Sequence, residues 1–467
     1  MPTSWNSPSL ERPLVADYLP HTESDIAEML AVLGLDSLED LFTHIPEALR
    51  LARSLEMPEG RSEPDVAARF EARAQANEGR GSRVVCFAGA GAYDHTVPPV
   101  VSSLGSRSEF VTAYTPYQPE VAQGVLQAIF EYQTMVSRLF GLEIANASLY
   151  DGATGLVEAL NMAHGSTGRS RMIISEGVHP HWRQVVATFA KGTGYEVVTV
   201  PLRDGVTDWS GLDVTDAAAV VVAYPNVLGV VEDVAGVMAR AHEAGALGVV
   251  GANPVALGVL TSPGDLGADI VVGEGQPFGM ALSFGGPYLG LFACTMDQIR
   301  RLPGRIVGET VDVDGRRAFV TTLRAREQDI RREKATSNIC SNQTLMAITA
   351  SIQLSYLGPT GLYEVAAHSA AGAHYLAERV SGVEGVSLVS SAPFLLEFAL
   401  RLPAPATRVI HEMAAAGVLA GVALDELSGD LGSSLENPSH VLLVAVTEKR
   451  TREQLDRYVD VLKKVVA

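Results

Sequence analysis

The sequence predicts an α/β fold in which a large, mostly parallel sheet is covered by helices and is followed by a smaller α+β domain. Two observations predict it. Between about residues 84 and 300, short apolar runs without strict alternation are separated by helical segments, which is typical of parallel strands covered on both faces. After about residue 345, long Ala-rich helices come first and strands follow, which is typical of a separate α+β domain. We expect an N-terminal helical arm (1–60), a large α/β domain (61–340) and a small C-terminal domain (341–467).

The N-terminal arm is expected to be helical. Ser24 precedes a periodic apolar run that stops at Gly34, and Ser37 opens a second segment with acidic residues in its first turn. Both patterns are typical of helix starts. The polar stretch over 57–83 predicts a further helix that joins the arm to the main body.

Within the large domain a helix is expected to start at Pro119 and end at Gly141, because apolar residues between them recur at helical spacing. The strands are expected at six apolar runs: 172–175, 196–201, 218–225, 247–253, 269–274 and 288–294. In the small domain we expect a long helix, two strands, a helix, a strand and a final helix.

Composition and charge exclude several classes of protein. The chain has 467 residues with 35 Lys and Arg against 54 Asp and Glu, a formal net charge of −19. This argues against a nucleic-acid partner, which needs clustered basic residues. No run approaches the roughly 20 apolar residues of a membrane span, and the first residues have no secretory pattern. The three cysteines are far apart and form no CxxC pair, so we expect a cytoplasmic protein without a zinc site.

The lysines are few and unevenly placed. Only five occur, and none lies between Lys191 and Lys334. The simple explanation for the low count is a genome that prefers arginine.

Three motifs could carry chemistry, each with a structural alternative. Asp151–Gly155 opens an apolar helix, where free backbone N–H groups could bind a phosphate, or it is an ordinary tight loop. Phe87–His95 and Thr112–Pro119 bring tyrosines and a histidine into a Gly- and Pro-rich region, where they contact a ligand or pack within the chain. Lys334–Gln343 offers hydroxyl and amide donors to an anion, or forms a capped turn between domains.

Three further candidates are weaker. The segments 273–278 and 283–287 place glycines near strand ends, where ligands approach open α/β sheets. His179 and His181 could ligate a metal, but no carboxylate or cysteine is spaced to complete a site, so we expect none. Cys340 has no base nearby in the sequence and is expected to be a structural thiol rather than a nucleophile.

Taken together, these motifs resemble the P-protein family of the glycine cleavage system, whose members are glycine dehydrogenases (decarboxylating) with the fold of type-I pyridoxal-phosphate (PLP) enzymes. The segments AGAYDH, TAYTPYQPEVAQGVLQAIFEYQ, ANASLYDGAT and ATSNICSNQ carry the resemblance. The resemblance covers nearly the whole chain. Where this enzyme is split into two subunits, the chain resembles the first, or α, subunit.

The resemblance implies a PLP site that this chain lacks the residues to complete. Such an enzyme needs a lysine for the Schiff base and an aspartate against the pyridine nitrogen. Val250 stands where the family has the aspartate, and Gln276 stands near the place of the lysine. His179 matches the histidine that stacks on the cofactor ring. We therefore expect no catalytic residue in this chain's own pocket.

The resemblance then implies a subunit that completes the active site of a partner. Thr336 and Asn338 are expected to bind the phosphate of PLP held by a β subunit. The expected assembly is an α2β2 heterotetramer. Tyr93, Tyr114, Tyr117 and His95 are expected to line the substrate mouth. The implied reaction is decarboxylation of glycine with transfer of the aminomethyl group to the lipoyl arm of the H-protein.

Two other functions remain open. The chain could be a pseudoenzyme with this fold that acts as a binding or regulatory module. It could also be an active enzyme that uses Cys340 or the pair His179 and His181, although nothing in their spacing supports this.

Overall fold

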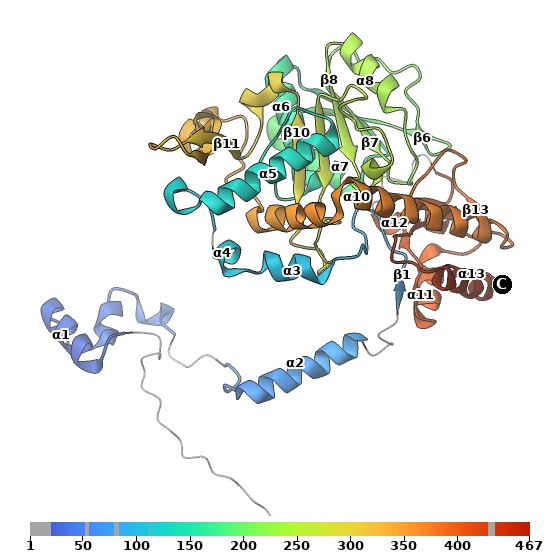
Figure 1. Cartoon of the computed structure of the whole chain (residues 1–467). Coiled ribbons are helices and arrows are strands. Elements are labelled where there is room, and N and C mark those ends of the chain that lie inside the picture. Colours follow the sequence, from blue (N-terminus) through green and yellow to red (C-terminus); the bar gives the residue numbers. More distant parts are fainter. Residues whose placement is uncertain (1–19, 52–55, 79–83, 113, 428–434) are drawn as a thin grey trace, which may run out of the picture. The chain divides into compact units, whose positions relative to one another are not determined.

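The computed structural model describes residues 20–51, 56–78, 84–112, 114–427 and 435–467. The chain divides into two compact units, residues 1–75 and residues 76–467, and each is described by itself (Figure 1). The start of the chain, on which the expectation about a secretory pattern rests, lies outside the described residues. Within the described residues, no helix combines the length and apolarity needed to cross a bilayer.

The first unit contains short helices. Helix α1 (Glu23–Leu33) ends at Gly34 in the left-handed conformation, as predicted, but it begins ahead of Ser24 because the Thr22 hydroxyl accepts the Asp25 N–H. The 3-10 turn η1 (Leu38–Phe42) follows Ser37, as expected. The remaining elements are η2 (Glu47–Leu49) and α2 (Glu63–Glu78), whose last residues belong to the second unit.

The second unit is built on a seven-stranded sheet with the order β2-β10-β9-β8-β7-β3-β4. Five neighbouring strands are parallel, and β10 beside them is antiparallel to β9. The edge strand β2 is antiparallel to β10, so it has the same direction as the five parallel strands. The predicted mostly parallel sheet is therefore confirmed. The strands are β2 (Ile144–Ala145), β3 (Arg171–Ser175), β4 (Glu196–Val200), β7 (Ala217–Tyr224), β8 (Leu247–Ala252), β9 (Ile270–Glu274) and β10 (Gly290–Cys294).

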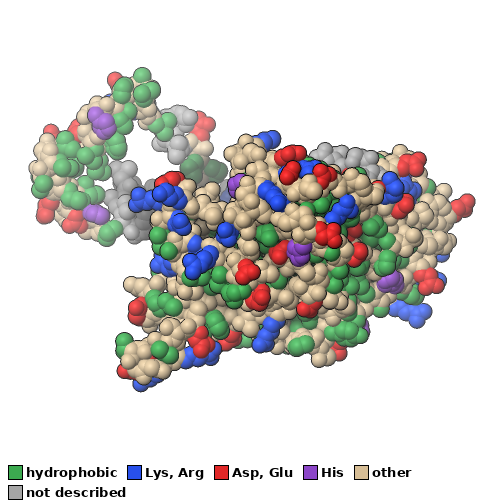
Figure 2. Space-filling model, turned by 90° about the horizontal axis from the view of Figure 1, so that it is seen from above, with side chains coloured by type: hydrophobic (Ala, Val, Ile, Leu, Met, Phe, Trp, Pro, Cys, Tyr) green, Lys and Arg blue, Asp and Glu red, His purple; other side chains and the backbone are tan. Residues whose placement is uncertain are grey.

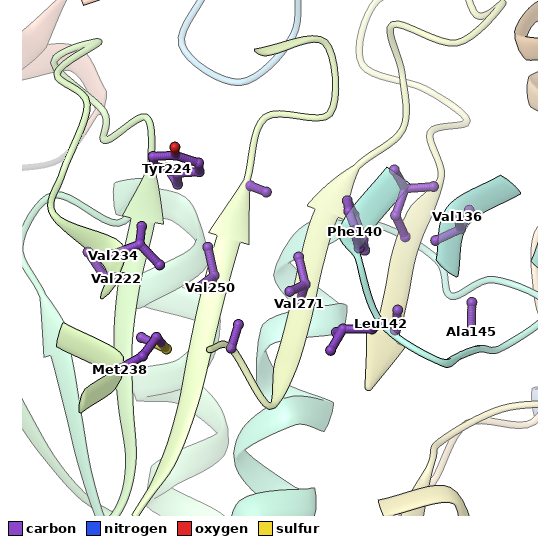
Figure 3. Close-up of a cluster of buried hydrophobic side chains, with 14 of the residues drawn as sticks. Val136, Phe140, Leu142, Ala145, Val222, Tyr224, Val234, Met238, Val250 and Val271 are labelled. Atoms are coloured by element: carbon purple, nitrogen blue, oxygen red, sulfur yellow. The ribbon is translucent and has the colours of Figure 1, made fainter. Parts of the chain in front are cut away.

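Alternate residues of the central strands enter two apolar clusters, one on each face of the sheet. Val249 packs in the cluster that includes α6 and α7, whereas Val250 packs with residues of α5, α8 and α10 (Figure 3). This explains the apolar runs without alternation, because both faces are covered. The helices are α5 (Gln123–Phe140), α6 (Gly152–Thr167), α7 (Pro180–Thr193), α8 (Val234–Glu243) and α10 (Thr344–Ser381).

The predicted start of α5 was wrong by four residues. Pro119–Val121 forms a separate 3-10 turn, and Ala122 has a non-helical ψ of 20°, so the helix begins at Gln123. Val121 consequently lies outside the buried stripe and is 81% exposed. The predicted end at Gly141 is confirmed, with φ 70°.

A second sheet with the order β13-β14-β17-β16 lies in the C-terminal part, packed with α10, α11 and α13 around its own apolar cluster. The predicted strands and helices of this part are present, and sequence reasoning missed β1, β15 and β16. Strand β1 (Val85–Cys86) pairs in parallel with β15 (Val418–Leu419), far along the chain. The others are β13 (Ser387–Leu388), β14 (Glu397–Arg401), β16 (Val422–Ala423), β17 (Val441–Ala445), α11 (Ala406–Ala415), α12 (Leu424–Leu427) and α13 (Arg452–Val466).

Shorter elements connect these parts. They are α3 (Pro99–Gly105), α4 (Ser108–Val111), α9 (Gln328–Arg331), the hairpin of β5 (Leu202–Arg203) and β6 (Val206–Thr207), and the hairpin of β11 (Ile306–Val311) and β12 (Arg317–Thr322).

Gly229, in the loop after β7, lies against the backbone of β14 at a point where no side chain fits. Its φ is +83°, and a Cβ there would lie 1.8 Å from the carbonyl oxygen of Glu397. Gly211 has a similar φ of +69°, but no atom lies within 4 Å of its Cβ position. Gly211→Ala should therefore cost only the left-handed strain of about 1–2 kcal/mol, whereas Gly229→Ala should cost at least about 2 kcal/mol more. Urea unfolding of both variants checks this, and equal losses would show that the close approach is unimportant.

Candidate active site

A cavity that opens to solvent lies at the carboxyl ends of four neighbouring strands of the large sheet. The next strand of the sheet after β3, β4, pairs with one edge of β3, and the following strand, β7, pairs with its other edge. The strand order therefore reverses at β3, and ligands of open α/β sheets bind at such a reversal. The lining residues follow strands β3, β7, β8 and β9 or come from the loop after β1 and from β14. They include Ala90, Gly91, Tyr93, Gly177, Val178, His179, Trp182, Pro225, Asn226, Ala252, Asn253, Glu274, Pro277 and Glu397.

Glu397 connects the loop after β1 to this cavity. Its carboxyl accepts the Ala90 N–H at 2.7 Å and the Tyr93 hydroxyl at 2.8 Å. Burial raises the pKa of Glu397 to about 7, although these two bonds favour the ionised form. Burial and the neighbouring Glu397 likewise raise the pKa of Tyr93 well above its usual range. Tyr93 is therefore a neutral hydrogen-bond donor to a carboxyl that titrates near neutral pH.

His179 is a neutral imidazole with a defined tautomer. Its Nε2 donates to the carbonyl of Ala90 at 2.8 Å, and its Nδ1 accepts the His181 N–H at 3.2 Å. Burial lowers the pKa of His179 to about 4. Its ring lines the cavity, so the side chain supplies an uncharged surface there.

Gln276 and Val250, which stand near the lysine and aspartate positions of the resembled family, are both buried and both packed within the chain. The Gln276 amide accepts the N–H of Tyr93 at 2.9 Å and donates to the carbonyls of Tyr93 at 3.1 Å and Met280 at 2.8 Å. Val250 lies in the apolar cluster beneath the strand ends (Figure 3). Neither side chain is among those that line the cavity.

The N-terminus of α6, where a cofactor phosphate would be expected, is occupied by the chain's own groups. Glu274 accepts the Gly152 N–H at 3.1 Å, and Asp151 accepts the Thr154 N–H at 2.7 Å. The ring of Trp182 lies against Gly152, so close that a Cβ would meet it at 2.2 Å. No lysine or arginine is among the residues that line the cavity as described. The site therefore does not fit a PLP bound to this chain.

Glu274 connects α6 to two further segments of this site. It also accepts the N–H groups of Gln276 at 3.1 Å and Leu289 at 3.0 Å. Burial raises its pKa to about 7 against the effect of these three N–H donors. In either protonation state the carboxyl fills the space beside α6, and in its ionised state it repels an incoming anion.

The segment over 334–343 lies on the surface with alternate residues turned outward. Thr336 and Asn338 are exposed, whereas Ser337 is half-buried and Ile339 is buried. The segment is fixed to the loop before α6, because Tyr150 accepts the N–H groups of Cys340 and Ser341 through its hydroxyl, each at 3.3 Å.

Arg305 brings this segment together with Tyr117. The buried guanidinium donates to the Tyr117 hydroxyl at 3.1 Å and to the Cys340 carbonyl at 3.0 Å. Tyr117 is 56% exposed and Tyr114 is 82% exposed, so both present aromatic surface outward. Two of the predicted motifs, 112–119 and 334–343, therefore lie side by side.

The other two predicted substrate residues lie inside the chain. Tyr93 and His95 are each 7% exposed; Tyr93 lines the cavity described above, and His95 lines a different one. Their expected contact with a substrate stays a prediction. No group of three or more metal-ligating side chains is found in the described part of the chain, and Figure 2 shows acidic and basic side chains interspersed on the visible face.

Sequence reasoning missed Glu397 and Arg305 and gave Glu274 no role. One signal was available: Glu397 is a carboxylate inside an otherwise apolar strand run, FLLEFAL, and a charge at a core position is rarely without a partner. Arg305 had no comparable signal, because its partners come from three separate segments.

Comparison with known proteins gives one consistent result. The family model described as "Glycine cleavage system P-protein" matches residues 16–462. A protein of Brevibacillus brevis named "Probable glycine dehydrogenase (decarboxylating) subunit 1" is 49% identical over 94% of this chain and 96% of its own length. A protein of Moorella thermoacetica with the same name is 46% identical over 96% of this chain and 100% of its own.

Solved structures agree with the sequence relatives. A crystal structure of a glycine decarboxylase (P-protein) of the glycine cleavage system, in inhibitor-bound form, has a TM-score of 0.86 at 45% identity. It covers 96% of this chain, and all of that chain is matched. A sphingosine-1-phosphate lyase of Burkholderia pseudomallei has a TM-score of 0.63 at 16% identity, over 90% of this chain and 94% of its own, and shows a shared fold.

The raised pKa of Glu397 makes stability depend on pH. The folded chain keeps this proton to about pH 7, whereas the unfolded chain releases it near pH 4, so stability falls as the pH rises between these values. Glu397→Gln should reduce the loss between pH 5 and pH 8 by up to about 3 kcal/mol, as measured by urea unfolding at each pH. Removal of an exposed carboxylate, Glu384→Gln, is the control, and equal pH profiles for Glu397→Gln and the unmodified chain would contradict the prediction.

Proposed function

Because this chain belongs to the glycine cleavage system P-protein family, we propose that it is the α subunit of a two-subunit glycine dehydrogenase (decarboxylating). In this proposal it carries no PLP itself and completes the active site of a lysine-bearing β subunit.

One observation carries the proposal: the positions that would hold PLP in this chain are used for internal bonds. Glu274 and Trp182 occupy the start of α6, and Gln276 binds Tyr93 and Met280 with both ends of its amide. No other lysine can substitute, since none lies between Lys191 and Lys334. The fold is retained while the groups for covalent chemistry are lost, which supports a role in a partner's site.

The surface formed by Tyr114, Tyr117, Thr336 and Asn338 is our candidate for contact with that site. The exposed hydroxyl and amide of Thr336 and Asn338 would donate to the cofactor phosphate of the β subunit, and the two exposed tyrosines would line the substrate mouth. Arg305 holds Tyr117 against the 334–343 segment, so this surface is organised before a partner binds.

PLP held by the β subunit would supply the electron sink for decarboxylation of glycine, and the aminomethyl group would pass to the lipoyl arm of the H-protein. The assembly would be an α2β2 heterotetramer in the cytoplasm. The alternative, a pseudoenzyme that acts as a binding or regulatory module, is favoured by the cavity that this chain keeps at the strand ends.

Restoring the lysine alone should not restore cofactor binding. Gln276→Lys cannot accept the Tyr93 N–H as the Gln276 amide oxygen does, and Glu274 still occupies the start of α6. We expect borohydride treatment of this variant with PLP to give far less than one pyridoxyl-lysine per chain at position 276. The lysine-bearing β subunit, treated in parallel, is the positive control, and near-stoichiometric labelling of position 276 would refute our account of the site.

The proposal itself is tested by co-expression with a lysine-bearing paralogue. We expect a complex with one PLP per αβ pair that catalyses exchange between glycine and CO2. The double variant Thr336→Ala, Asn338→Ala should retain PLP at least about tenfold more weakly, because hydrogen bonds to charged groups contribute about 1.5–3 kcal/mol each. The exposed Thr310 on the nearby hairpin provides the control Thr310→Ala. If no complex forms and no exchange between glycine and CO2 appears, the result contradicts the proposal and supports the alternative of a binding module.

A further inference from the structure

A second cavity lies against α10 and has mainly apolar walls. Its apolar lining comes from α10, from the loop after β9, from the residues after β8 and from the residue before α3. These residues are Pro98, Val255, Pro277, Phe278, Leu357, Leu362 and Val365, and Tyr356 also borders the cavity. None of the sequence motifs predicted this space, since its walls come from five separate parts of the chain.

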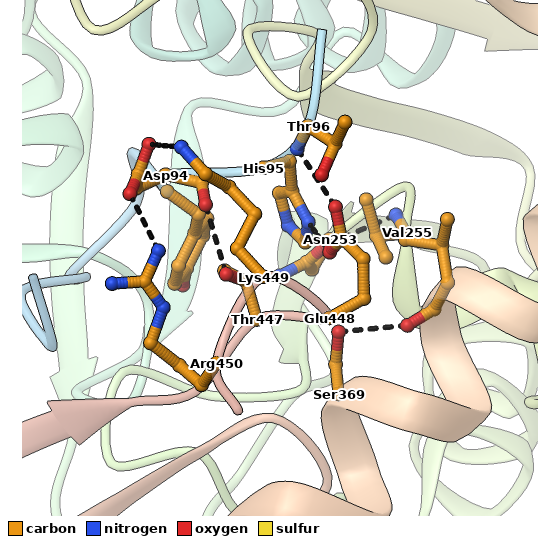
Figure 4. Close-up of polar contacts among 12 residues, drawn as sticks. Asp94, His95, Thr96, Asn253, Val255, Ser369, Thr447, Glu448, Lys449 and Arg450 are labelled. Carbon is orange, nitrogen blue, oxygen red and sulfur yellow. Dashed lines mark hydrogen bonds and ion pairs between the residues drawn. The ribbon is translucent and has the colours of Figure 1, made fainter. Parts of the chain in front are cut away.

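The polar end of this cavity is organised by Glu448. Its carboxyl accepts from the His95 Nδ1 at 2.6 Å and from the Thr96 N–H at 2.7 Å, as Figure 4 shows. Burial alone would raise the pKa of Glu448, but the bond to His95 and the Thr96 N–H outweigh it and lower the pKa to about 2. The carboxylate is thus fully engaged, and it fixes the orientation of the His95 ring.

Two buried polar atoms of the lining have no partner. The Nε2 atom of His95 and the Oε1 atom of Gln353 make no hydrogen bond with any residue that the structure describes. Gln353 is 3% exposed, and its Nε2 donates to the carbonyl of Thr96 at 3.3 Å, which places the amide beside the His95–Thr96 loop. An unpaired buried polar atom costs about 1–3 kcal/mol, so each of these atoms is expected to have a partner that the protein chain does not supply.

We propose that this cavity binds a small neutral molecule with an aliphatic body and an uncharged amide head, placed between His95 Nε2 and Gln353 Oε1. The amide NH2 would donate to Gln353 Oε1. Its carbonyl would accept from Nε2 when that atom carries a proton, and its second N–H would donate to Nε2 when it does not.

Charged heads fit this site less well. A carboxylate has no proton for Gln353 Oε1 and would lie near the Glu448 carboxylate, and no lysine or arginine is among the lining residues described. An ammonium group could donate to Gln353 Oε1 and to an unprotonated His95 Nε2, but it has no acceptor for a protonated Nε2. It would also lose its hydration among apolar walls. The inference concerns this chain's own residues and does not depend on the proposed function.

The test is binding of hexanamide to the full chain, measured by ligand-observed NMR and calorimetry. We expect hexanamide to bind at least tenfold more tightly than hexanoate, hexylammonium or acetamide, which lacks the tail. This comparison needs no variant. Equal affinity for hexanamide and either charged analogue, or no binding at all, would overturn the proposal.

Variants locate the site. Gln353→Leu removes the unpaired oxygen and should weaken hexanamide binding at least tenfold, and Val365→Phe should abolish it by filling the space for the tail. Glu364→Gln, exposed on the same helix and outside the lining, should bind as the unmodified chain does. Circular dichroism shows whether each variant is folded. Unchanged binding by folded Val365→Phe would place hexanamide elsewhere and refute the assignment.

Discussion

The carboxyl of Glu274 is the group on which the candidate site most depends. It accepts three backbone N–H groups, from Gly152 at the start of α6, from Gln276 after β9 and from Leu289 before β10. Three segments that meet at the carboxyl ends of the strands are thereby joined at one point. The N-terminus of a helix is a natural anion site, and here that place is filled from within the chain.

The loop over residues 87–96 is likewise held by hydrogen bonds from side chains that are distant in the sequence. Gln276 and Glu397 hold it from the side of the first cavity, and Glu448 holds it at His95 and Thr96. Asp94 adds ion pairs with Lys449 at 2.6 Å and Arg450 at 2.9 Å (Figure 4). The loop thus spans two cavities, and each is lined by a residue that the loop presents. The loop is therefore a hydrogen-bonded frame that borders both cavities.

Much of the fold could be predicted because apolar periodicity reports burial directly. The six expected runs became strands of the large sheet, and Gly34 and Gly141 end their helices as predicted. The start of α5 could not be predicted from Pro119, since a proline at a first turn serves a 3-10 turn equally well. Strand β1 could not be predicted either, because its partner strand lies more than 300 residues later and two residues carry no periodic signal.

The sequence by itself determined what this chain cannot do: without a lysine between residues 191 and 334, it has no amine there for a Schiff base. That is a matter of covalent composition, and it holds for any fold. The tertiary structure alone decided how the space is used instead. Glu274 fills the start of α6, Glu397 titrates near neutral pH, and His95 belongs to a second cavity. Each of these properties arises from burial and from partners that are distant in the sequence, and no local pattern encodes them.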